Sequence, residues 1–281
     1  MFRGHVGSGR AVALGVVIAL LLAARPAGGA SLLDVMEVTH CGQVVGDGEV
    51  GELRGDLDCA APTTFPFSAE GVHLSAGATL RMNGFAIRGD GSGVGITCFG
   101  PGEPNPAPCT LEGPGEIRGF WAAINGAGCA LVARDLVMTE NSNGIVAALR
   151  CRLEATRIVA SDNTELGIWA TEVHGRDVDA SRNGGAGVVA PFDIDVRRLC
   201  AIDNGREGVR LARFRGGDGR IVDSVVVRND RLGQGFDIAA AGRLRLVRTQ
   251  CGRSAKLRYR RHPETNGYQP RVVGSFGCAQ D

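Results

Sequence analysis

The sequence predicts an all-β solenoid, in which short strands form coils that stack along one axis. Three observations predict it: an excess of glycine, a repeat with a period near 21 residues, and a charged column that alternates in sign along that repeat. Of the 281 residues, 43 are glycine and only 5% are aromatic. Because glycine in a helix interior costs about 1 kcal/mol relative to alanine, a helical bundle is disfavoured. The glycines have no three-residue period, which excludes collagen, and 44% hydrophobic residues exclude wholesale disorder.

The repeat is an asparagine followed within a few residues by a glycine and an apolar residue. Its asparagines are separated by 22, 20, 21 and 25 residues, and they are Asn141, Asn163, Asn183, Asn204 and Asn229. Counting back from each asparagine, positions −10, −8, −5 and −3 hold mostly small or branched apolar residues. The alternation at −10 and −8 predicts a strand, and the break before −5 predicts a bend. Stacked coils of this kind bury an apolar face that one coil cannot bury alone.

We expect the asparagines at a bend of the coil. Asparagine tolerates the left-handed backbone region and bonds to nearby backbone groups, and stacked asparagines can also bond to one another along the axis. The outward column at position −6 supports this register. It alternates between acidic and basic residues, and its members are Asp135, Arg157, Asp177, Arg198, Asp223 and, in the imperfect last repeat, Arg248. Stacked side chains should alternate in sign because like charges in direct register repel, so we interpret the column as a solvated ladder rather than a binding stripe.

Residues 1–30 have the layout of a secretory signal peptide. Arg3 and Arg10 give a positive start, an uninterrupted apolar run spans 11–23, and small residues precede a cleavage site after Ala30. The run is too short for a membrane anchor, which needs about 20 apolar residues. We therefore predict a secreted or periplasmic protein with one domain at 31–281 and no membrane span after cleavage. The mature chain has 28 basic and 30 acidic residues, so its global charge gives no support for a nucleic-acid partner.

The coil pattern resembles the right-handed parallel β-helix superfamily, the pectin-lyase-like fold. The N-terminal part carries the resemblance further: Cys41-Gly42, Asp56-Leu57-Asp58-Cys59, and the segment Gly77-Ala78-Thr79-Leu80-Arg81-Met82-Asn83-Gly84-Phe85-Ala86-Ile87. Exported bacterial proteins of this superfamily often begin this way. The resemblance covers roughly 41–255 and implies the fold. The polygalacturonase, alginate-epimerase and pectate-lyase catalytic signatures are missing or incomplete, so the resemblance does not decide whether the protein is an enzyme.

One constellation is a candidate site. The register stacks three carboxylates, Glu172, Asp193 and Asp218, at strand spacing. Such a group either takes up a proton or holds a hard cation such as calcium through its oxygens. Beside it a second column holds His174, Asp195 and Arg220, in which Asp195 would set the tautomer of the histidine for acid–base work. The resemblance implies that Arg220 or His174 would be the base of a lyase, whereas the alternative is a polar exterior whose charges partly neutralise.

The second candidate is a basic segment near the C-terminus. Between 238 and 263 there are eight Lys or Arg residues and no acid. Guanidinium groups suit the carboxylates or sulfates of acidic glycans, and aromatic faces stack on sugars. The expected glycan-binding residues are Arg243, Arg245, Arg258, Arg260 and Tyr259. The alternative is the charged outer face of the last coils and their cap.

Nine cysteines lie in the mature part, as expected of disulfides in an exported chain. We expect Cys41 and Cys59 to clamp an N-terminal cap at about 31–70. Cys98 and Cys109 should pin the excursion between them, and Cys251 and Cys278 should tie a C-terminal cap or tail at about 252–281 over the last coil. Cys129 and Cys151 fall one coil apart, where they either bridge or stack as thiols. Cys200 is left over, and we expect it to be a buried small apolar residue.

Together these features favour an exported protein that contacts acidic polysaccharide and carries no recognisable catalytic signature. Two alternatives remain open: a polysaccharide lyase or uronate epimerase, with calcium as its possible cofactor, and a structural or adhesive surface module. The sequence does not indicate an oligomeric state.

Overall fold

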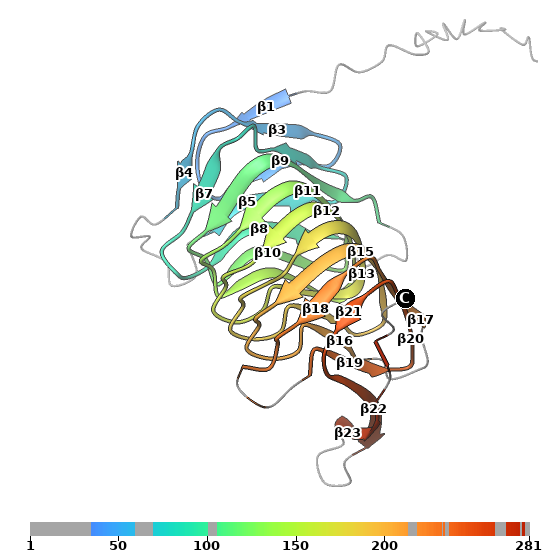
Figure 1. The fold of residues 1–281 in the computed structure, drawn as a ribbon. Coiled ribbons are helices and arrows are strands. Elements are labelled where there is room, and N and C mark those ends of the chain that lie inside the picture. Colours follow the sequence, from blue (N-terminus) through green and yellow to red (C-terminus); the bar gives the residue numbers. More distant parts are fainter. Residues whose placement is uncertain are drawn as a thin grey trace, which may run out of the picture. The chain divides into compact units, whose positions relative to one another are not determined.

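The chain winds into a solenoid whose strands pair in parallel with the strand one coil away (Figure 1). The computed structural model describes residues 35–59, 70–100, 106–212, 218–231, 233, 236–261, 268–275 and 277–278. Each coil contributes to three faces in a fixed order, which we call sheet 1, sheet 2 and sheet 3. The all-β solenoid predicted from the repeat is confirmed.

The strands divide among the three faces as follows. Sheet 1 consists of β2 (Gln43–Val45), β5 (Glu70–Ser75), β8 (Val94–Phe99), β10 (Ala122–Ala127), the starts of β12 (Asn143–Ala160) and β13 (Ile168–Asp179), β14 (Val188–Ala190), β16 (Val209–Ala212) and β19 (Ile238–Ala241). Sheet 2 consists of β1 (Val35–Val38), β3 (Val50–Leu53), β6 (Thr79–Arg81), the starts of β9 (Cys109–Arg118), β11 (Ala130–Met138) and β15 (Asp193–Ile202), the middles of β12 and β13, β17 (Asp218–Val222) and β20 (Arg243–Val247). Sheet 3 consists of β4 (Leu57–Asp58), β7 (Ala86–Arg88), the ends of β9, β11, β12, β13 and β15, β18 (Val225–Val227) and β21 (Gln250–Cys251).

The solenoid ends in an antiparallel hairpin of β22 (Ser254–Arg261) and β23 (Tyr268–Gly274). The start of β22 pairs in parallel with β19, so the hairpin grows directly out of sheet 1. Figure 1 shows it extending beyond the last coil. At the other end, the region expected to form a cap already contains β1 to β4, which pair with strands of the following coil.

The core is a narrow column of aliphatic side chains inside the three sheets. The inward position −10 is filled by residues that are all 0% exposed: Leu131, Leu153, Val173 and Ile194. These four are consecutive partners in the parallel register of sheet 2, as the repeat predicts. Short branched side chains fill this space because the sheets enclose it closely, which explains the low aromatic content.

A ladder of buried asparagines runs along the corner between sheet 3 and sheet 1. The side-chain Oδ1 of Asn183 accepts hydrogen bonds from the backbone N and the Nδ2 of Asn163, at 3.1 and 3.0 Å. Its own Nδ2 donates to the Ala160 carbonyl and to Oδ1 of Asn204. Asn141, Asn204 and Asn229 lie in the same ladder. Each asparagine therefore satisfies buried backbone groups of the coil before it, which would otherwise lack partners.

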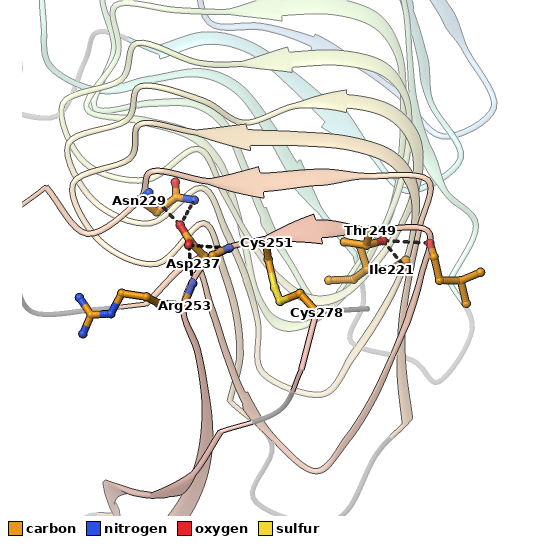
Figure 2. Close-up of a disulfide and its surroundings, with 9 residues drawn as sticks. Ile221, Asn229, Asp237, Thr249, Cys251, Arg253 and Cys278 are labelled. Atoms are coloured by element: carbon orange, nitrogen blue, oxygen red, sulfur yellow. Dashed lines mark hydrogen bonds between the residues drawn. A yellow bond between two sulfur atoms is a disulfide. The ribbon is translucent and has the colours of Figure 1, made fainter. Parts of the chain in front are cut away.

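The asparagine ladder ends at a buried carboxylate, Asp237 (Figure 2). Its Oδ1 accepts hydrogen bonds from the backbone N and the Nδ2 of Asn229 at 2.8 and 3.0 Å. Its Oδ2 accepts from the backbone N of Gly252 and Arg253 at 3.0 and 2.7 Å. Four N–H donors thus surround one carboxylate where the last coil begins.

The left-handed residue of this corner is not the asparagine, contrary to the sequence-based expectation. Positive φ falls one residue earlier, as at Asp162 (58°), Arg182 (56°) and Asp203 (58°). A second left-handed position, between sheet 2 and sheet 3, is the charged column at −6, for example Asp177 at 57°. The asparagines are buried and held by the ladder, so the exposed neighbour before each one makes the turn.

The −6 column forms ion pairs between successive coils, as its alternating sign predicts. Arg157 pairs with Asp135, Arg198 with Asp177, and Arg248 with Asp223 at 2.5 Å. The hydrogen bond from Arg198 lowers the pKa of the Asp177 carboxyl. The corner beside the asparagine ladder carries a matching set that the sequence analysis missed, including pairs of Arg182 with Asp162 and Arg228 with Asp203.

Four disulfides link the chain: Cys41–Cys59, Cys98–Cys109, Cys129–Cys151 and Cys251–Cys278. The structure thus answers the open question on Cys129 and Cys151 with a bridge between adjacent coils. Cys200 is free but is not the buried residue we expected. It lies between inward Leu199 and inward Ala201, so the alternation of the strand turns it to the outer face of sheet 3, where it is partly exposed.

The predicted signal peptide at 1–30 lies outside the described residues. The described part of the chain contains no helix with the length and apolar character that a membrane crossing requires.

We predict that Asn183→Ala lowers the free energy of unfolding by about 3 kcal/mol, because it leaves several buried polar groups of the preceding coil without partners. Denaturant-induced unfolding would measure the change. The matched control is Arg182→Ala, an exposed neighbour in an ion pair, for which we expect less than about 1 kcal/mol. Equal losses in the two variants would contradict a structural role for the asparagine ladder.

The lowered pKa of Asp177 predicts an acid-dependent contribution to stability. A carboxyl with a lower pKa in the folded state stabilises the fold at pH values above its unfolded pKa, and loses this effect as the pH falls through the folded pKa. Asp177→Asn should therefore unfold at a lower temperature than the parent at pH 7 but at the same temperature near pH 2. Thermal unfolding across this range tests it. In an Arg198→Gln background the effect of Asp177→Asn should depend much less on pH, because the largest cause of the lowered pKa is gone.

Candidate functional site

A groove of about 650 Å³ lies along the turns that join sheet 1 to sheet 2. Its floor includes the Cys129–Cys151 disulfide and the start of the sheet 2 strands. Pro106 and Pro108, from the excursion before β9, and Phe192, from the turn before β15, contribute apolar surface. Phe192 is 45% exposed, so a large aromatic face is available to a bound molecule.

The polar lining of the groove comes from two successive coils. It consists of Arg150, Arg152, Glu154, Thr171 and Glu172. Arg152 is paired with Glu154 at 3.0 Å. Arg150 is exposed, has a φ of 66°, and has no ion pair or hydrogen bond among the residues whose side chains are described. The groove therefore offers one guanidinium that is unpaired among the described residues and, two coils further along the solenoid, an exposed aromatic ring.

The predicted catalytic residues stack in one column on the outer face of sheet 2. His174 pairs in register with Asp195, and Asp195 pairs with Arg220. The imidazole makes a different contact from the one we expected: its Nε2 lies 4.0 Å from Oε2 of Glu172 on its own strand. Side chains two residues apart on a strand point to the same face. The imidazole therefore contacts Glu172 of its own strand, where we had expected Asp195 of the next coil to orient it.

The predicted metal ligands lie at the start of three successive sheet 2 segments. Glu172 pairs in register with Asp193, and Asp218 begins the next strand of sheet 2. The side chain of Asp218 lies outside the described part. Among the side chains that are described, no group of three His, Cys, Asp or Glu residues is arranged to hold a metal ion. The Oδ1 atom of Asp193 is buried and has no hydrogen-bond partner in the described structure.

The predicted glycan-binding residues fall on two separate elements. Arg243 and Arg245 lie on the outer face of β20 in sheet 2, in register with Asp218 and Arg220. Arg258 and Tyr259 belong to the terminal hairpin instead. Burial raises the pKa of the Tyr259 hydroxyl. Arg260 also lies on this hairpin, but its side chain is outside the described part.

On the outer face of sheet 2, the ion pairing of the arginines changes along the solenoid. In its N-terminal half, Arg81 bridges Glu52 and Glu112 at 3.0 and 3.4 Å. In its C-terminal half, four exposed arginines have no ion pair with any described residue: Arg176, Arg220, Arg243 and Arg245. The arginines of this sheet that have no ion pair with a described residue are therefore concentrated in the later coils.

Sequence reasoning missed Arg150, Phe192 and the two prolines of the groove. All four lie in the turns between sheet 1 and sheet 2, which differ in length from coil to coil and carry no repeat. The sequence offered only an indirect indication of the groove: the expected disulfide Cys98–Cys109 marks the excursion that contributes Pro106 and Pro108.

The architecture is a right-handed parallel β-helix, the fold that the sequence resemblance implied. Among solved structures, the A-module of the mannuronan C-5 epimerase AlgE4 from Azotobacter vinelandii matches with a TM-score of 0.52 and 15% identity, covering 77% of this chain and 68% of that one. The A-module of AlgE6 from the same organism matches with a TM-score of 0.47 and 14% identity, over 79% of each chain. The pectate lyase Pel9A gives 0.32 and 12%, over 73% of this chain and 55% of its own. No protein-family model matches the sequence, and a comparison with curated proteins finds no relative. At these identities the likeness shows the fold alone.

Proposed function

We propose that the protein is exported and binds an acidic polysaccharide along sheet 2, with the groove as its principal contact. The observation that carries the proposal is the pairing of an unneutralised guanidinium, Arg150, with the exposed ring of Phe192 in one groove. A guanidinium binds a uronate carboxylate through two parallel N–H donors, and an aromatic ring stacks on the apolar face of a sugar. Export is supported by the four disulfides, which persist in oxidising compartments.

The unpaired arginines of the later coils extend this site. Adjacent coils are about 4.8 Å apart, close to the rise of one sugar unit, so a chain lying along the solenoid would meet a new row of side chains at each step. Arg220 and Arg245 are in register on successive strands and face outward. We propose that the polysaccharide runs from the groove towards these arginines, where its carboxylates meet uncompensated positive charge.

We predict that Arg150→Ala and Phe192→Ala each weaken binding to polygalacturonate or alginate about tenfold, because each variant removes a main contact. Affinity measured by calorimetry at low and high salt tests this, and the neutral polymer dextran should not bind. Arg118→Ala is the matched control: this arginine lies on sheet 3, away from the groove, and its loss should leave the affinity unchanged. Undetectable binding of both polyuronates at low salt would contradict the proposal.

A second candidate is catalysis on the same polymer, favoured by the position of His174. Its imidazole stands beside Glu172, which lines the groove, and a carboxylate at that position supports a histidine acting as a general base. Both reactions begin when a base removes the proton α to a uronate carboxylate. Loss of the O4 substituent then gives elimination, whereas return of a proton to the opposite face gives epimerisation. Arg220 is the alternative base within the same column.

The catalytic candidate predicts that the parent forms unsaturated uronate, seen as new ultraviolet absorbance, or inverts uronate stereochemistry, seen by proton NMR. His174→Ala should abolish this turnover and leave polymer affinity within about twofold. The same assay with a chelator tests the calcium prediction for Glu172, Asp193 and Asp218. Binding without turnover in every assay would leave the protein a polysaccharide-binding module.

A further inference from the structure

The outer face of sheet 3 is bordered on both sides by charged columns. We call the column between sheet 2 and sheet 3 column A; it spans six successive coils, and its members in coil order are Asp135, Arg157, Asp177, Arg198, Asp223 and Arg248. Column B lies five residues further along in the first five of these coils, at the left-handed corner beside the asparagine ladder. Its members are Glu140, Asp162, Arg182, Asp203 and Arg228.

Between the two columns the outer face is short-chained and largely apolar. Its central column, read in the parallel register, is Val137, Val159, Asp179, Cys200, Val225 and Gln250. Val137 and Val225 are 39% and 36% exposed. An apolar centre with a charged border is an arrangement found in protein–protein interfaces.

The charges of this face are complementary to the same face of a second copy. A two-fold axis parallel to the strands, passing between the third and fourth coils, places the first coil opposite the sixth, the second opposite the fifth and the third opposite the fourth. In column A every contact then joins opposite charges: Asp135 with Arg248, Arg157 with Asp223, and Asp177 with Arg198. In column B the same operation joins Asp162 with Arg228, and Arg182 with Asp203.

No other simple arrangement of the two copies pairs as many opposite charges without bringing like charges together. A shift by one coil places Asp135 opposite Asp223. A shift by two coils in either direction keeps column A complementary but leaves only four coils in contact, and in one direction it also sets Glu140 against Asp203. An axis along the solenoid sets Asp135 against Glu140. The two columns together therefore select one orientation and one register.

The in-chain ion pairs leave these groups able to make further contacts. Arg157 and Arg198 each bind their own aspartate through Nε and Nη2, which leaves other N–H donors of the guanidinium unused. Their side chains are 54% and 47% exposed. Near the axis, the operation places Asp179 opposite Cys200 of the second copy.

We propose that sheet 3 is the interface of a homodimer in which two copies pack face to face about this axis. Six strands spaced by about 4.8 Å and five residues of about 3.3 Å each give a footprint of roughly 450 Å² per copy, which is small for a specific interface. The dimer is therefore weak and reversible, and it depends on ionic strength because its border is charged. Facing sheets lie about 10 Å apart, so the two Cys200 side chains do not form a disulfide.

Sedimentation equilibrium of the full chain, from about 1 µM to about 1 mM protein, tests the proposal. We expect a monomer–dimer equilibrium at low salt that shifts at least tenfold towards monomer at about 0.5 M salt. A monomer at every concentration in low salt would overturn the proposal.

A charge-swap series tests the register itself. Asp135→Arg with Arg157→Asp keeps an in-chain pair but brings like charges together across the interface, so the dimer should weaken at least tenfold. Asp177→Arg with Arg198→Asp is the matched control, because these residues face each other across the axis and the swap preserves their complementarity; its dimer should match the parent. Adding Asp223→Arg and Arg248→Asp to the first swap should restore dimerisation. Equal behaviour of the first swap and its control would reject this interface.

Discussion

The rest of this structure depends on one interaction: asparagine side chains accept hydrogen bonds from buried backbone N–H groups. At the corner between sheet 3 and sheet 1 the chain turns inside the protein, where an unpaired N–H would cost about 1–3 kcal/mol. Asn163, Asn183 and Asn204 supply the acceptors from one coil to the next. Because the corner is fixed in this way, every coil enters sheet 1 at the same point. The columns of the other faces follow from that alignment.

Both proposed surfaces are consequences of this shared register. On sheet 2 it brings Arg220 and Arg245 onto one line, and on sheet 3 it brings the charges of columns A and B to the same height in each coil. The two faces differ in their turns. The corners bordering sheet 3 are short and nearly constant, which leaves a flat surface suited to another flat surface. The turns between sheet 1 and sheet 2 vary, and this variation makes a groove suited to a polymer.

The sequence was sufficient to predict the fold and the register because both depend on a repeated local pattern. The inward column of Leu131 and Leu153 and the alternating column of Asp135 and Arg157 were predicted correctly from spacing alone. The left-handed position was wrong by one residue, since spacing does not tell which member of Asp162-Asn163 turns and which is buried. The contact of His174 with Glu172 was not predicted, because spacing between coils points to Asp195 and not to a neighbour on the same strand. The groove could not be predicted, since Arg150 and Phe192 come from turns without periodicity.

The carboxylate of Asp237 gives the asparagine ladder a direction and an end. Along the ladder, the backbone N–H of each asparagine donates to the side-chain oxygen of the asparagine in the next coil, so the rungs are interchangeable units of one polarity. The carboxylate of Asp237 has only acceptors: it receives hydrogen bonds from Asn229 on one side and from Gly252 and Arg253 on the other. A whole repeat added or deleted upstream would leave this polarity intact, whereas the side chain of Asp237 has no N–H group to donate to a further asparagine. The number of rungs can therefore change by whole coils before Asp237, and the ladder ends at that side chain.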